Sequence, residues 1–89
     1  MPPWSGRYAQ RWTAATIAAY GTTCHLCRTA GADTADHVQP RSKGGRDSLG
    51  NLRPAHHACN SLRGDMPLGE WYARHPAPRR DPLPPSRNW

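Results

Sequence analysis

The longest amphipathic run of the chain is RYAQRWTAATIAAY, residues 7–20. Its apolar positions recur at intervals of three and four residues, which places their side chains on one face of an α-helix. Gly21 follows at once, and glycine often ends a helix because it adopts positive φ without strain. The pattern therefore predicts a helix over residues 7–20. The residues on its apolar line are Tyr8, Trp12, Ala15 and Ala19.

The middle of the chain predicts a β-hairpin. Residues 33–39 can form a short strand, and Leu52-Arg53 can form the return strand. The loop between them contains Gly44-Gly45, a pair that permits a turn with positive φ. Pro54 is expected to end the second strand, because proline has no N–H to donate to a neighbouring strand.

Two short helices and a tail are expected after the hairpin. The helices are predicted over residues 57–63, which Gly64 closes, and over residues 67–74, where Pro67 suits the first turn. From residue 76 onward five of 14 residues are proline and three are arginine. Residues 76–89 are therefore expected to be extended or disordered.

Composition indicates one small α+β domain with a thin apolar core. The chain has 89 residues, of which 36% are hydrophobic, and it contains no Phe. So small a core indicates that a metal, disulfides or a partner stabilises the fold. The expected organisation is a flexible arm at 1–6, a domain at 7–75 with its centre at 24–63, and a tail at 76–89. The residues expected in the core, rather than stacked on bases, are Trp4, Trp12, Trp71 and Tyr72.

The charge of the chain favours an acidic partner. Twelve basic residues face six acidic ones, for a formal net charge of +6. All the basic residues except Lys43 are arginines, whose planar fork fits phosphate oxygens in pairs. A basic surface favours nucleic acid through counterion release, although codon bias in a GC-rich genome is an alternative source of arginine. Charge alone leaves both readings open.

The location expected for the protein is the cytoplasm. No stretch approaches the ~20 apolar residues of a membrane span, and the first residues lack the apolar segment of a signal peptide. Because thiols stay reduced in the cytoplasm, the three cysteines of the protein are expected to bind metal rather than form disulfides. A secreted disulfide miniprotein is the disfavoured alternative.

Two short Cys/His motifs predict a structural zinc site. A CxxC motif begins at residue 24 and an HxxC motif begins at residue 56. Together they supply the four ligands of a closed tetrahedral site, whose binding energy couples to folding. The spacing favours His56 over His57, and His25, between the first two cysteines, is expected to point to solvent. The predicted ligands are Cys24, Cys27, His56 and Cys59.

The combined pattern resembles the HNH endonuclease family in its zinc-supported, ββα-metal form. The resemblance covers about residues 24–63 and implies a small ββα-metal (HNH) domain of the α+β class, with an N-terminal helix and a structural zinc. Small free-standing members of the family look like phage proteins. The residues that carry the resemblance are Cys24-x-x-Cys27, Asp36-His37, Gly44-Gly45, Asn51-Leu52 and His56-x-x-Cys59-Asn60.

The resemblance implies hydrolysis of DNA phosphodiester bonds with one divalent cation. His37 matches the general base that activates water, and Asn51 matches the middle Asn, which holds the hairpin and orients that base. Asn60 stands where many members have His, and Asp36 matches the acidic residue that shares the cation with this last position. Carboxylate and amide oxygens suit Mg²⁺ or Mn²⁺. Because strand neighbours point to opposite faces, Asp36 and His37 can serve one site only where the strand bends or ends.

Basic residues around these motifs are expected to contact DNA phosphates, which positions DNA without reading its sequence. Low sequence specificity follows, and Arg79, Arg80 and Arg87 of the tail can add further phosphate contacts. The resemblance suggests phage DNA processing, with terminase as a possible partner and a monomer or weak dimer as the working state. The alternative is a zinc-stabilised nucleic-acid-binding adaptor without catalysis. The residues expected at phosphates are Arg41, Lys43, Arg46, Arg53 and Arg63.

Overall fold

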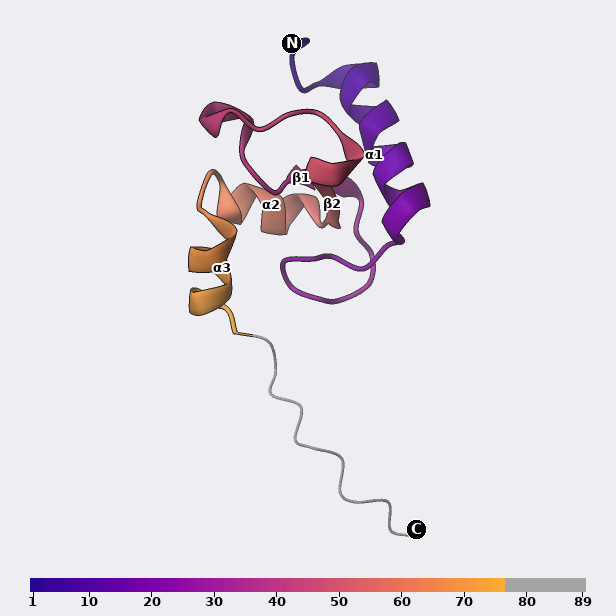
Figure 1. The fold of residues 1–89 in the computed structure, drawn as a ribbon. Coiled ribbons are helices and arrows are strands. Elements are labelled where there is room, and N and C mark those ends of the chain that lie inside the picture. Colours follow the sequence, from indigo (N-terminus) through magenta and orange to yellow (C-terminus); the bar gives the residue numbers. More distant parts are fainter. Residues whose placement is uncertain (77–89) are drawn as a thin grey trace, which may run out of the picture.

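The first helix, α1 (Gly6–Tyr20), packs against both strands of the hairpin that follows it. The protein is seen here in a computed structural model that describes residues 1–76 (Figure 1). The helix begins one residue before the predicted start and ends as predicted, where Gly21 adopts a φ of 87°. Thr16 is its fully buried residue, and the Thr16 hydroxyl donates to the carbonyl of Trp12 at 2.7 Å. Ala19, the last residue of the predicted apolar line, is exposed.

Strands β1 (Thr34–His37) and β2 (Leu52–Ala55) form a two-stranded antiparallel sheet. The register pairs His37 with Leu52 at one end of the hairpin. Strand β2 continues through Pro54 instead of ending there, as the sequence had suggested. Each strand of a two-stranded sheet is an edge strand, so a residue without an N–H is tolerated.

The loop between the strands contains two 3-10 turns, η1 (Arg41–Lys43) and η2 (Leu49–Asn51). Gly44 adopts a φ of 85°, as predicted for this turn. Gly45 lies so close to the preceding chain that a Cβ there would stand 1.7 Å from the carbonyl oxygen of Gln39. The loop therefore folds back tightly on the residues that leave β1.

Helices α2 (His57–Arg63) and α3 (Leu68–Arg74) complete the described chain. Both lie where the sequence predicted them, with α3 starting one residue later. Figure 1 shows α1 and α3 at opposite ends of the molecule, with the hairpin and α2 between them. This arrangement confirms the predicted α+β class and the ββα order of hairpin and helix.

The apolar core lies between the Cys24 turn, α2 and α3. Trp71 is buried at its centre, and the indole N–H donates to the carbonyl of Leu26 at 3.0 Å. Tyr72 packs against this cluster, whereas Trp4 and Trp12 are half-buried elsewhere. The buried members of the cluster are Cys24, Leu26, Ala32, Ala55 and Trp71.

Within residues 1–76, no helix has the length and apolar character needed to cross a membrane. The tail predicted at 76–89 lies outside the described residues, apart from Pro76.

Candidate metal centre and active site

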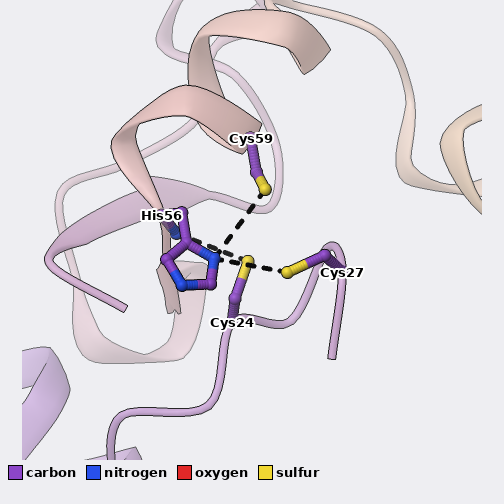
Figure 2. A group of neighbouring side chains, drawn as sticks. All are labelled: Cys24, Cys27, His56 and Cys59. Carbon is purple, nitrogen blue, oxygen red and sulfur yellow. Dashed lines mark hydrogen bonds between the residues drawn. The ribbon is translucent and has the colours of Figure 1, made fainter. Parts of the chain in front are cut away.

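Four metal-ligating side chains converge where the turn after Cys24 meets the start of α2 (Figure 2). Their ligand atoms all lie within 4.8 Å of one another. His56 Nδ1 is 3.2 Å from Cys27 Sγ and 3.8 Å from Cys59 Sγ. Ligands on a tetrahedral zinc ion with bonds of about 2.0–2.3 Å stand about 3.5–3.8 Å apart. The cluster of Cys24, Cys27, His56 and Cys59 therefore has the composition and the spacing of a zinc site.

Backbone hydrogen bonds shape the turn that carries the first two cysteines. The N–H of Cys24 donates to Thr29 at 2.9 Å, and the N–H of Arg28 donates back to Cys24 at 2.7 Å. Arg28 takes a φ of 66°, which is uncommon for a residue with a side chain. These bonds bring Cys24 and Cys27 to the same side of a closed turn.

The ring of His56 is oriented by a contact outside the cluster. Its Nε2 lies 2.9 Å from the carbonyl oxygen of Ala30, so Nε2 carries the proton and Nδ1 keeps its lone pair for a metal. A Cβ at Gly31 would stand only 3.2 Å from this nitrogen, so glycine leaves room for the ring. His57 is exposed and lies outside the cluster, which agrees with the choice of His56.

The cysteines differ in their electrostatic environment when no metal is bound. A hydrogen bond from the Thr29 hydroxyl lowers the pKa of Cys27 to about 6. Burial raises the pKa of Cys59 to about 12. A hydrogen bond to the Ala30 carbonyl raises the pKa of His56. Because a metal needs the thiolate, binding of a cation at this cluster would release protons from its cysteines.

His37 lies at the end of β1 and is 8% exposed. Its Nε2 is 2.8 Å from Oδ1 of Asp47, a residue of the long loop. The indole of Trp4 stands edge-to-face against the imidazole, with 4.4 Å between the ring centroids. Sequence reasoning missed both contacts, because Asp47 belongs to a loop and Trp4 precedes the first helix.

Asp47 also accepts hydrogen bonds from Tyr8 and Arg41. Burial acts to raise the pKa of Asp47, but hydrogen bonds from Arg41, Tyr8 and His37 outweigh it. The pKa of Asp47 therefore lies well below its usual range, and the carboxylate is ionised at neutral pH.

Asp36 points away from His37, toward α2 and the Cys24 turn. Its Oδ2 is 2.6 Å from Nη1 of Arg63 and 2.7 Å from Nε2 of His25. The prediction that His25 points to solvent is therefore wrong. The Tyr72 hydroxyl reaches the carbonyl of His25 at 3.2 Å, which ties α3 to the same polar network.

Arg63, which the sequence analysis placed at DNA phosphates, is the second residue whose surroundings differ from the expectation. Its side chain is fully buried and bonds three backbone carbonyls besides Asp36. Because the guanidinium is fully buried, it does not reach a DNA phosphate, and Arg63 connects α2 to the end of β1 instead. The carbonyl partners belong to His37, Val38 and Met66.

The two asparagines predicted at the site have different surroundings. The Asn51 amide bonds Gln39 through both its oxygen, at 2.9 Å, and its nitrogen, at 3.1 Å. The same nitrogen donates to the carbonyl of Arg46 at 2.9 Å. Asn60 is half-buried on α2, and within residues 1–76 no hydrogen bond joins its side chain to Asp36.

The other basic residues expected at phosphates surround the loop. Lys43 donates to the carbonyl of Asp65 at 2.8 Å, and Arg41 is paired with Asp47. The guanidinium of Arg53 lies over the Tyr20 ring, 4.4 Å from its centroid. Arg46 is exposed. Lys43 and Arg46 are thus the most accessible charges of the predicted set.

Comparison with known proteins agrees with this geometry. A search of curated proteins and a search of solved structures found no match. A family model described as HNH endonuclease matches residues 23–66. The matched segment contains both strands, α2 and the whole Cys/His cluster. Residues 23–66, just under half of the chain, are therefore similar to the HNH endonuclease domain.

Proposed function

We propose that the protein is a metal-dependent DNA endonuclease in which His37 is the general base. The observation that supports this most is the way Asn51 holds the chain that follows His37. The N–H of Val38 donates to the Asn51 carbonyl at 2.8 Å, and the Asn51 amide bonds both backbone groups of Gln39. These bonds fix the backbone beside the candidate base, in a segment that matches the HNH family.

The proposed reaction is attack of water on a DNA phosphorus. His37 takes a proton from the water, the new P–O bond forms, and the bond from phosphorus to the leaving oxygen breaks. The leaving oxygen takes its proton from solvent. Histidine suits this step because its ordinary pKa lies close to neutral pH.

The residues proposed to hold the catalytic Mg²⁺ or Mn²⁺ are Asp36 and Asn60. Arg63 and His25 occupy only Oδ2 of Asp36. Within residues 1–76, Oδ1 has no hydrogen bond, and the Asp36 side chain as a whole is 4% exposed. A cation bound there would stabilise negative charge on the phosphate and the leaving oxygen. Carboxylate and amide oxygens suit these hard cations.

The Cys/His cluster is proposed to hold a structural zinc, because its four protein ligands leave no position for a substrate. The nuclease domain would span residues 7–75. Phosphate contacts are proposed for Lys43, Arg46 and the partly exposed Arg41 and Arg53, with low sequence specificity.

We also propose a phage DNA-processing role beside a terminase, in the host cytoplasm, which rests on the similarity to the HNH family. Working as a monomer or weak dimer, a single active site would nick one strand per encounter. The competing function is a zinc-stabilised adaptor that binds nucleic acid without cutting it.

Supercoiled-plasmid cleavage tests the nuclease directly. We expect nicking with Mg²⁺ or Mn²⁺, none with EDTA, and at least about a 10²-fold lower rate for His37→Ala, because a general base contributes about that much or more. His57→Ala is the matched control, since it removes an exposed histidine outside the cluster. We expect it to cut like the wild type.

Binding measurements separate the two functions. His37→Ala should still bind the plasmid as the wild type does. A wild-type protein that binds DNA but cuts it with neither cation would favour the adaptor, and an undiminished rate in His37→Ala would remove His37 from the mechanism.

A further inference from the structure

The loop between the strands places one buried carboxylate at the centre of a set of hydrogen-bond donors. The side chain of Asp47 is 4% exposed. Arg41 donates to it through Nε at 3.0 Å and through Nη2 at 2.9 Å. The Tyr8 hydroxyl donates to the same Oδ2 that Nη2 contacts. The remaining partner is His37 Nε2, 2.8 Å from Oδ1.

The charge state of Asp47 decides which nitrogen of His37 carries the proton. Arginine stays protonated, so its fork faces an ionised carboxylate that can only accept. Nε2 of His37 must therefore donate to Oδ1, which leaves the lone pair on Nδ1. A neutral imidazole in this tautomer can accept a proton only at Nδ1.

The accepting nitrogen is open. Within residues 1–76, no side-chain hydrogen bond involves Nδ1 of His37, and no buried side-chain nitrogen lacks a partner, so Nδ1 retains part of the 10% exposure of this side chain. Trp4 lies edge-to-face against the ring and restricts its tilt. The ring is thus held on one side by Asp47 and open at the nitrogen that would accept a proton.

We propose that Asp47 is a positioning residue for His37, holding the imidazole in the Nε2–H tautomer and aiming Nδ1 at the attacking water. This inference rests on the proposed nuclease function. Water transfers its proton to Nδ1, while the Nε2 proton stays in the hydrogen bond to Asp47. The carboxylate remains ionised and stabilises the positive charge that the ring acquires.

The position of Asp47 is itself determined by Asn51. The Asn51 amide donates to the carbonyl of Arg46, the residue directly before Asp47. The same amide bonds Gln39, two residues after His37. One asparagine therefore holds the backbone on both sides of the Asp47–His37 contact, which gives a physical reason for its place in the motif.

The test combines kinetics with NMR of the zinc-loaded full chain. We expect Asp47→Ala to lower kcat for plasmid nicking by about 10- to 100-fold, with KM changed by less than about 3-fold. Asp47 acts through a general base, and a general base increases the rate by about 10²–10⁴-fold. Asp47→Asn, which keeps one accepting oxygen, should fall between Asp47→Ala and the wild type. Asp65→Asn removes a carboxylate from an exposed position and should cut like the wild type.

A structural role is excluded by two further readouts. In a His37→Ala background, Asp47→Ala should not lower the residual rate further, whereas general loosening of the loop would. In ¹⁵N NMR, the wild type should show a His37 Nε2–H proton protected from exchange, and Asp47→Ala should lose it.

The outcomes distinguish this inference from the proposed function. A normal kcat in Asp47→Ala, together with an inactive His37→Ala, would overturn the positioning role and leave His37 as the base. Absence of the protected Nε2–H signal would overturn the proposed tautomer. A wild type that never cuts would remove the proposed function. NMR could then still detect the hydrogen bond from His37 to Asp47, but that bond would have no role in catalysis.

Discussion

Neighbouring residues on one strand can have unrelated partners, and Asp36 and His37 are such a pair. Adjacent side chains on a strand leave opposite faces, so Asp36 reaches α2 while His37 reaches the long loop. Each polar group is buried, and each is matched by an opposite charge or a hydrogen bond. Burial of such groups is tolerated because none of the buried side-chain nitrogens or oxygens in residues 1–76 is left without a partner.

Removing Arg63 should destabilise the fold strongly. Arg63→Met leaves Asp36 without its buried cation and three backbone carbonyls without their donor. We expect the free energy of unfolding to fall by about 3–5 kcal/mol, the cost of breaking a buried ion pair by removing one partner. Urea unfolding of the zinc-loaded protein, followed by circular dichroism, measures it.

The matched control is Arg74→Met, which breaks an exposed pair with Glu70 on α3. Exposed ion pairs contribute about 0–1 kcal/mol, so this variant should unfold almost as the wild type does. Equal losses in the two variants would show that the buried network around Asp36 is not formed in solution.

At the scale of elements, the Cys/His cluster joins the segment after Cys24 to the start of α2, and hydrogen bonds from His56 to Ala30 and from His57 to Asp33 support the same junction. The turn after Cys24 and the start of α2 meet at the cluster, and among residues 1–76 the apolar cluster beside it has five buried members. So small a core stabilises a domain only weakly, so a zinc ion bound at this cluster would contribute a large part of the stability.

Removal of zinc should therefore unfold the domain. We expect about one zinc ion per purified chain and loss of most helical circular dichroism on treatment with a strong chelator, because structural zinc couples directly to folding. Cys59→Ser should lose zinc, while His57→Ala should keep it. A chelated protein that retains both its helices and its cooperative unfolding would contradict a structural role for the metal.

At the scale of the whole molecule, charge and shape favour contact with a phosphate backbone over reading of bases. The net charge of +6 comes almost entirely from arginine. Within residues 1–76 the longest helix, α1, is committed to packing on the hairpin, and α2 and α3 have only seven residues each. None of them is the long recognition helix that reads bases in the major groove.

Binding to DNA should therefore depend on salt and little on sequence. Without divalent cation, we expect two unrelated duplexes to bind with similar affinity. The affinity should fall as salt rises, with a slope of about −0.9 per phosphate neutralised. Arg46→Ala should lower the magnitude of that slope by about one on both duplexes. Arg74→Ala, an exposed arginine on α3, is the control, and a large preference for one duplex would contradict the prediction.

The elements of this fold follow from local patterns. Helices α1 and α2 end where glycine permits positive φ, and the Cys/His spacing alone identified the four residues that converge on one site. The helix ends depend on residues a few positions apart. The metal site depends on two Cys/His motifs whose residue types are those of zinc ligands. Both features are therefore visible in the sequence.

Tertiary structure alone decided which polar groups pair. The sequence predicted His37 and Asp36 as site residues, but it did not indicate that Asp47 would hold the first or that His25 and Arg63 would hold the second. Each pairing joins residues at least ten positions apart, through a loop or across a turn. No periodic pattern encodes such a contact, because it depends on how the backbone closes and on which buried charge would otherwise lack a partner.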